Sequence, residues 1–84
     1  MRFAYFYFVA DEPDRIRAVA PQHAACWQDL TLRGYLGGPF VDRSCGLLTF
    51  EAESTDEAQR LIAEDPFFQQ ALLRSRWLKQ WILD

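Results

Sequence analysis

The stretch FAYFYFV, residues 3–9, decides the fold of this 84-residue chain. A strand with one wet face alternates polar and apolar residues, whereas both faces of this stretch are apolar. It therefore predicts a central β-strand that is covered on both sides. The turn-forming run DEPD, residues 11–14, ends this strand.

Residues 15–33 follow as a helical region that Pro21 interrupts. Proline is tolerated in a first helical turn but disrupts a helix interior. We therefore expect a short helical turn over residues 13–19 and a main helix over residues 21–32. Gly34 stands where a glycine commonly ends a helix.

The apolar face of this main helix carries the only histidine of the chain. His23, Trp27 and Leu30 are spaced i, i+4 and i+7, so they share one face. A histidine on an apolar face is either a core residue or a functional one, and the pattern alone favours the core. His23 is still the best candidate for function.

The remaining chain predicts two strands and a second helix. Residues 35–41 form a short strand with an irregular middle, and residues 46–52 form a third strand that is largely apolar on both faces. Ser54 and Glu57 have the spacing of a capping box, in which each side chain bonds the other residue's backbone N–H. This box opens a helix that runs to about Glu64.

The last segment adds a short helix over residues 67–72 and a final strand over residues 77–82, with Trp77 and Trp81 on one face. The order βαββαβ predicts an α+β fold, an antiparallel sheet with its helices on one face. The other face, which is also apolar, predicts a homodimer in which two sheets pack together.

Composition supports a single domain over residues 1–84 with a small core. Half of the residues are apolar, with three Trp, three Tyr and seven Phe, which again favours burial against a second copy. A net charge of −3 argues against a nucleic-acid partner. No apolar run is long enough to span a membrane and no signal peptide is evident, so we expect a cytoplasmic protein.

Metal and cofactor sites are not indicated. Cys26 and Cys45 lack CxxC spacing and have no Cys/His pair beside them, which favours free thiols. No Gly-rich phosphate loop and no nucleophile motif is present. We therefore expect neither a metal nor a cofactor.

Several features, in this order, resemble the YciI family (YCII-related domain) over essentially the whole chain. They are the aromatic first strand, Pro21-Gln22-His23, Gly37-Gly38-Pro39, the Ser54-to-Glu57 helix start and Glu64-Asp65-Pro66-Phe67. The resemblance implies a ferredoxin-like fold in a dimeric α+β barrel. The chain departs from the family at Ala20, where many members carry arginine, and in a shorter connection after the Gly-Pro motif.

The resemblance also implies a candidate active site built on a histidine and an aspartate, here His23 and Asp65. An aspartate that accepts from one imidazole nitrogen fixes the tautomer and leaves the other nitrogen free for a proton. Without such a role, His23 is a core histidine, and Asp65 is a turn initiator before proline. A minority of the family is associated with dehydrochlorination or related chemistry on aromatic hydroxy compounds, a substrate that we do not extend to this chain.

Further candidate pocket residues are Gly38, Pro39, Tyr5 and Trp27. The Gly-Gly-Pro segment could let a ligand approach the backbone, although a strand bulge explains it as well. The phenols of Tyr5 and Tyr7 could face a pocket, but core packing explains them too.

Arg15, Arg17 and Arg43 could bind an acidic group or form a solvated surface.

The sequence therefore leaves three hypotheses open. The first is an enzyme that uses a His-Asp pair as general acid or base on a small molecule, with hydroxylated aromatic compounds as one class to test. The second is a non-catalytic module that binds a small ligand in the same pocket. The third is a purely structural dimer.

Overall fold

The computed structural model describes residues 1–84, and its main elements follow the predicted order. The four strands are β1 (Arg2–Val9), β2 (Leu36–Pro39), β3 (Cys45–Glu51) and β4 (Leu73–Gln80). The three helices are α1 (Pro13–Asp29), α2 (Thr55–Ala63) and α3 (Pro66–Gln69). The predicted ferredoxin-like α+β fold is confirmed, and α3 corresponds to the short helix that was predicted after α2.

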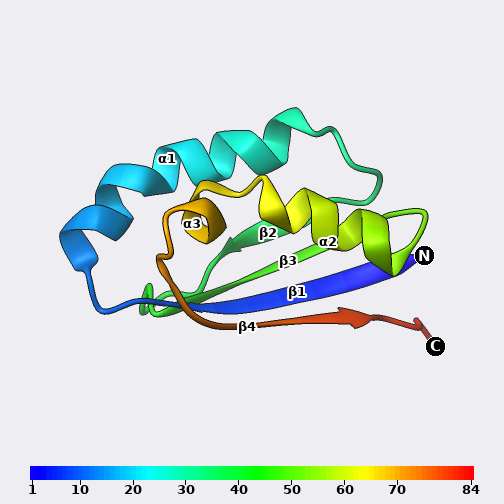
Figure 1. Cartoon of the computed structure of the whole chain (residues 1–84). Coiled ribbons are helices and arrows are strands. Elements are labelled where there is room, and N and C mark those ends of the chain that lie inside the picture. Colours follow the sequence, from blue (N-terminus) through cyan, green and yellow to red (C-terminus); the bar gives the residue numbers. More distant parts are fainter.

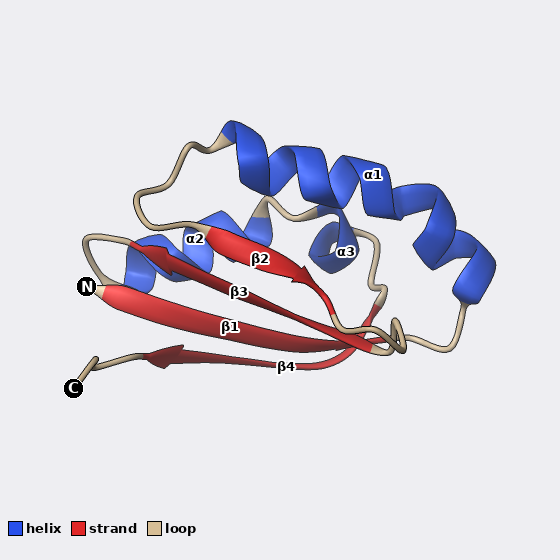
Figure 2. Ribbon diagram, turned by 180° about the vertical axis from the view of Figure 1, so that it is seen from behind, coloured by secondary structure: helices blue, strands red, loops and turns tan.

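The sheet is antiparallel throughout, with the strand order β2-β3-β1-β4. Strand β1 is central, as predicted. All three helices lie on the same side of this sheet (Figure 1), and the view from behind shows the same arrangement (Figure 2). We call the covered side the helix face and the other side the open face.

The alternation along β1 distributes its residues between these faces. Phe3, Tyr5 and Tyr7 are buried on the helix face, whereas Phe6 and Phe8 are only half-buried on the open face. The prediction that β1 is covered on both sides is therefore wrong within one chain, because no element of the chain packs on the open face.

Helix α1 is one continuous helix, so the predicted break at Pro21 is wrong. A proline inside a helix costs about 3 kcal/mol, because it removes a hydrogen bond and clashes with the preceding turn. The helix buries Val19, His23 and Trp27 on one face. Since burying a large side chain contributes roughly 1.5–3 kcal/mol, this packing outweighs the cost of the proline.

The end of α1 also differs from the prediction. The helix ends at Asp29, and Thr31, not Gly34, takes the left-handed conformation beyond it, with φ 49°. Gly34 has φ 65° in the turn that follows, where its carbonyl accepts a hydrogen bond of 3.2 Å from the Arg2 guanidinium. Glycine is favoured at position 34 because residues with a Cβ rarely adopt this positive φ.

Helix α2 begins at the predicted cap. Ser54 Oγ accepts from the Glu57 N–H at 3.1 Å. The Glu57 carboxylate accepts from the Glu53 N–H at 3.3 Å, rather than from that of Ser54. The first hydrogen bond of the capping box is therefore present, whereas the second goes to the N–H of the residue before Ser54.

The C-terminal elements lie earlier than predicted. Helix α3 ends at Gln69 because Ala71 adopts φ 56°, which starts a new chain direction. Strand β4 then begins at Leu73, four residues before the predicted start. Its polar first half pairs only with β1, and an edge strand tolerates polar side chains.

The sequence left open whether the Gly-Gly-Pro segment in β2 forms a strand bulge. This strand pairs with β3 in an unbroken register from Leu36↔Thr49 to Pro39↔Gly46, so it contains no bulge.

None of the three helices is long and apolar enough to cross a membrane.

Candidate active site

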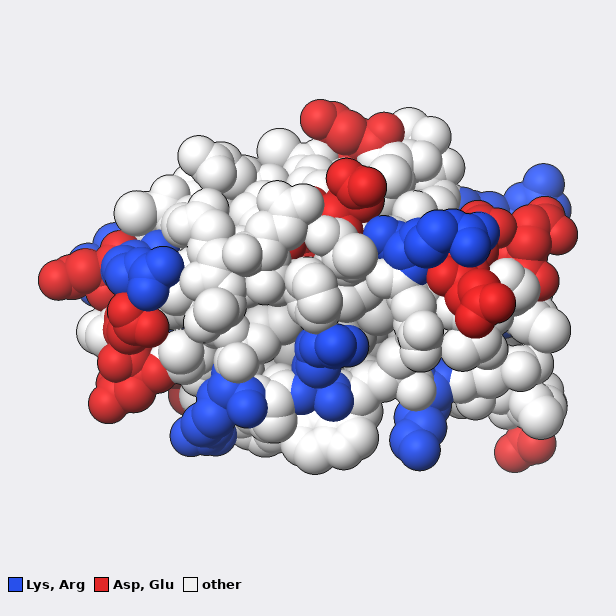
Figure 3. All heavy atoms as spheres, in the orientation of Figure 1, with Lys and Arg blue, Asp and Glu red and all other residues white.

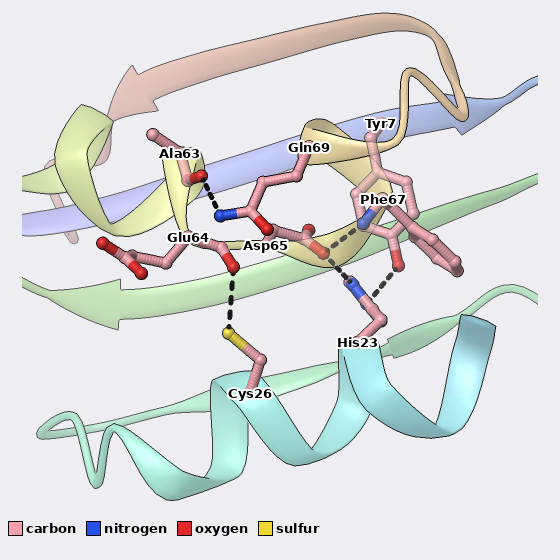
Figure 4. Close-up of polar contacts among 8 residues, drawn as sticks. All are labelled: Tyr7, His23, Cys26, Ala63, Glu64, Asp65, Phe67 and Gln69. Carbon is pink, nitrogen blue, oxygen red and sulfur yellow. Dashed lines mark hydrogen bonds and ion pairs between the residues drawn. The ribbon is translucent and has the colours of Figure 1, made fainter.

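His23 and Asp65 meet on the helix face, although 42 positions separate them in the sequence. Helix α1 carries the imidazole, and the segment between α2 and α3 carries the carboxylate (Figure 4). The distance between His23 Nδ1 and Asp65 Oδ1 is 2.8 Å. The structure therefore brings together the two residues that the family resemblance singled out; their catalytic role stays a prediction.

Asp65 is held by local backbone structure. It is the N-cap of α3, with Pro66 in the first helical position, and its Oδ1 accepts from the Phe67 N–H at 2.9 Å. An aspartate is a preferred N-cap and a proline a preferred first residue, so the Asp-Pro-Phe segment forms this arrangement by itself. The carboxylate is fully buried, and its orientation toward α1 is thereby determined.

The second ring nitrogen of His23, Nε2, also has a hydrogen-bond partner. Its Nε2 lies 3.0 Å from the hydroxyl of Tyr7, and the ring stacks on Phe67 with 4.2 Å between centroids. A carboxylate only accepts hydrogen bonds, so we assign the proton of the neutral ring to Nδ1. Nε2 then accepts from the phenol O–H of Tyr7.

Tyr7 is a residue that sequence reasoning weighed but did not select. It lies directly across from Gly46 in the β1–β3 register, and a Cβ on Gly46 would lie 2.3 Å from the phenol oxygen. Burial, with the negative charge of Asp65 as a second cause, raises the pKa of Tyr7 well above its usual range. The phenol therefore stays protonated at neutral pH.

A cavity of about 940 Å³ lies beside this group. His23, Tyr7 and Phe67 line it from the helix face, and Pro39 and Ala20 also contribute to its wall. A pocket of this size can hold a small organic molecule. His23 is buried, with 8% of its surface exposed, and it lines this cavity.

The other predicted pocket residues lie elsewhere. Tyr5 and Trp27 are fully buried in the core, with 6.1 Å between their ring centroids, and neither lines the cavity. Gly38 lies on the open face, where it lines a separate hollow of about 430 Å³. Pro39 alone among these four residues lines the cavity beside His23, and the ligand role of all four stays a prediction.

The charged side chains near the cavity are mostly on the surface. Arg15 and Arg17 donate to Glu12 at 2.8 Å and to Asp14 at 3.2 Å, in exposed pairs along α1. Arg17 and Arg43 also line the cavity, whereas Arg15 does not. Acidic and basic side chains are interspersed on the face that Figure 3 shows, without one continuous field of either sign.

Metal-ligating residues do not gather in this structure. No group of three or more His, Cys, Asp and Glu side chains is arranged to hold a metal ion, and both cysteines are free thiols. That the protein needs no metal or cofactor stays a prediction.

Comparison with known proteins shows a solved structure with a similar fold and the family of the chain. The structure resembles that of 5-chloro-2-hydroxyhydroquinone dehydrochlorinase from Burkholderia phenoliruptrix AC1100, solved in complex with 2,5-dihydroxybenzoquinone, with a TM-score of 0.86 and 22% sequence identity. The match covers 98% of this chain and 94% of the other. No curated protein sequence matched. A family model for the YCII-related domain matches residues 1–82, so the chain belongs to the YCII-related domain family.

Proposed function

We propose that this protein is an enzyme that moves a proton on a small hydroxylated molecule, with His23 as the general acid or base. The observation that carries the proposal is that the imidazole of His23 lies 2.8 Å from Asp65 and that His23 lines the cavity. General acid–base catalysis by a positioned side chain contributes about 10²–10⁴-fold to a rate. Asp65 is then the positioning residue that maintains the tautomer.

The structural neighbour supports the class of reaction. It is a dehydrochlorinase bound to a dihydroxybenzoquinone, and a dehydrochlorination removes a proton together with chloride. A group that accepts or returns a proton is what the His23–Asp65 pair offers. Phe67, which stacks on His23 and lines the cavity, suits a flat aromatic substrate. Elimination or proton transfer on a hydroxylated aromatic compound is therefore the first reaction to test.

The test is turnover of a panel that comprises 5-chloro-2-hydroxyhydroquinone, chlorohydroquinone and chlorocatechol. We expect wild type to convert at least one compound, and His23→Gln to lower kcat by about 10²-fold or more. Asp65→Asn should lower kcat by about tenfold or more, because the amide no longer favours the required tautomer. Glu64→Gln, which neutralises an exposed carboxylate one residue away, is the matched control and should leave kcat unchanged.

Two outcomes would contradict the proposal. One is equal activity in wild type, His23→Gln and Asp65→Asn, with circular dichroism showing all three folded. The other is the absence of turnover by wild type across the panel.

A non-catalytic ligand-binding module is the second candidate, because the same cavity serves either role. Its signature is calorimetric binding of a panel compound that His23→Gln weakens, without any product. The third candidate is a purely structural dimer, in which the His-Asp pair only stabilises the fold; the full burial of Asp65 favours it. His23→Ala would then lower the free energy of unfolding by roughly 1–3 kcal/mol, because it leaves the carboxylate without its partner, and would change no ligand binding.

We also propose that the protein is a homodimer through the open face, in the manner of an α+β barrel. Four aromatic side chains form an open-face aromatic cluster with ring centroids 5.3–6.2 Å apart: Phe6, Phe8, Phe40 and Trp77. Trp77 and Trp81 are 48% and 46% exposed in the single chain. An exposed aromatic surface of this kind is typical of an interface between subunits.

A further inference from the structure

We propose that Tyr7 is a further catalytic residue, whose hydroxyl lies between His23 and the substrate and carries the proton from one to the other. The inference rests on the proposed function, since it names the group through which His23 acts. It also names the part of the substrate that is recognised, which is an acidic hydroxyl such as that of a phenol or an enol.

The first observation is that both ring nitrogens of His23 already have partners. Nδ1 lies 2.8 Å from Asp65 and Nε2 lies 3.0 Å from the Tyr7 hydroxyl. Figure 4 draws both contacts as dashed lines that join the imidazole to Asp65 and to Tyr7. A proton that leaves a molecule in the cavity therefore reaches Nε2 either by displacing the phenol or by passing through it.

The second observation is that the phenol cannot easily move aside. Its ring packs at 5.6 Å from Tyr5 and at 6.1 Å from Phe67, and the residue is 3% exposed. The hydroxyl occupies space that exists only because position 46 is glycine. Displacing the phenol would require these rings to repack, which close-packed interiors resist. Transfer through the hydroxyl needs no such movement.

The third observation is that the hydroxyl has unused acceptor capacity. A phenol oxygen donates one hydrogen bond and can accept others. Tyr7 uses its proton on Nε2, and no donor of the chain bonds to its oxygen. Because Tyr7 also lines the cavity, a substrate O–H can donate to it. This produces a continuous series of hydrogen bonds from the substrate through Tyr7 and His23 to Asp65.

The transfer through this series balances in protons and charge. The substrate O–H bond breaks and its proton forms a new O–H bond on the Tyr7 oxygen, while the original Tyr7 proton forms the Nε2–H bond. The substrate becomes an anion, His23 becomes an imidazolium beside the Asp65 carboxylate, and Tyr7 is a neutral phenol before and after. The reverse sequence returns the proton.

The environment of Tyr7 favours a simultaneous movement of the two protons. Burial and the charge of Asp65 raise the pKa of the phenol, which disfavours a free phenolate. Tyr7 therefore receives one proton as it releases the other. The positive charge forms only on His23, where the Asp65 carboxylate stabilises it.

The experiment uses Tyr7→Phe, which retains the ring and removes the hydroxyl, with the panel compound that wild type converts fastest. We expect kcat to fall by about 10²-fold while KM changes by no more than about threefold. Tyr35→Phe is the matched control: it removes a phenol hydroxyl that does not line the cavity, and it should leave both constants unchanged. Unchanged kcat in Tyr7→Phe, with His23→Gln inactive, would overturn the role of Tyr7 and leave the proposed function intact.

A proton inventory in mixtures of H₂O and D₂O gives a second measurement that a structural role for Tyr7 does not change. Because two protons move in the same transition state, a plot of wild-type kcat against the deuterium fraction should be curved. A straight line for wild type would overturn the relay, even where Tyr7→Phe folds poorly. Activity in His23→Gln equal to that of wild type would instead refute the proposed function, and the relay with it.

Discussion

The two faces of the sheet are both apolar, yet they differ in what they bury. The helix face encloses polar groups within its aromatic core, among them the imidazole of His23, the carboxylate of Asp65 and the phenol of Tyr7. The open face presents the open-face aromatic cluster and places no hydrogen-bonded polar network under it.

The difference between the two faces supports a separate role for each. Burying a polar group costs free energy unless the group is hydrogen-bonded. The core nevertheless retains His23, Asp65 and Tyr7 in one hydrogen-bonded network, which indicates a specific role for that network. An apolar surface without such groups gains stability simply from being covered. This difference supports the two proposals above, which place the reaction on the helix face and the subunit contact on the open face.

The largest expected effect comes from removing the central aromatic residue of the helix face. Trp27 is fully buried, so Trp27→Ala should lower the free energy of unfolding by about 3–5 kcal/mol. Trp77→Ala is the control on the open face and should cost less than about 1 kcal/mol. Urea denaturation, at a concentration where light scattering reports monomers, measures both. Similar losses in the two variants would contradict the distinction between the faces.

The second prediction concerns the open face alone. We expect wild type to be a dimer at micromolar concentration, and Trp77→Glu to raise the dimer Kd by more than about tenfold, because the new carboxylate would be buried without a partner. Gln80→Glu adds the same charge to β4 with its side chain toward the helix side, and should leave the dimer intact. Light scattering distinguishes the two states. A monomeric wild type would refute the assignment.

The smallest effect is a dependence of stability on alkaline pH that originates in the helix face. Burial, followed by the charge of Asp65, raises the pKa of both Tyr5 and Tyr7 above the usual 10.0. Above pH 10 the unfolded chain therefore loses phenol protons that the folded chain retains, so the free energy of unfolding falls as pH rises. Below that pH the contribution of these phenols is complete.

Urea denaturation between about pH 8 and pH 11 measures this decline. Tyr5→Phe should make it shallower, because one of the two titrating groups is gone. A free energy of unfolding that stays constant over this range would show that the phenols ionise as freely in the folded protein as in the unfolded one.

Much of the fold was predictable because it depends on local rules. The doubly apolar stretch of residues 3–9 indicated the central strand, and the spacing of His23 and Trp27 indicated the buried face of α1. The errors occurred where packing outweighs a local preference. Pro21 does not break α1, because the buried face of the helix extends across it.

The candidate site was less accessible to sequence reasoning. The pairing of His23 with Asp65 followed from a family resemblance, since no spacing rule relates residues 42 positions apart. The contact of Tyr7 with His23 was missed because it depends on the β1–β3 register, which places Gly46 opposite Tyr7. A register of this kind is decided between strands and not within either one.

The sequence by itself determined the elements whose signals are local, such as the central strand, the Ser54 cap and the chain reversal at Asp65-Pro66. Only the tertiary structure decided that α1 continues through Pro21, that the Asp65 cap faces His23, and that Tyr7 completes the series. The physical reason is that caps and alternation act within a few bonds along the chain. The positions of His23, Asp65 and Tyr7 relative to one another result from burying α1 and α3 on the same side of one sheet.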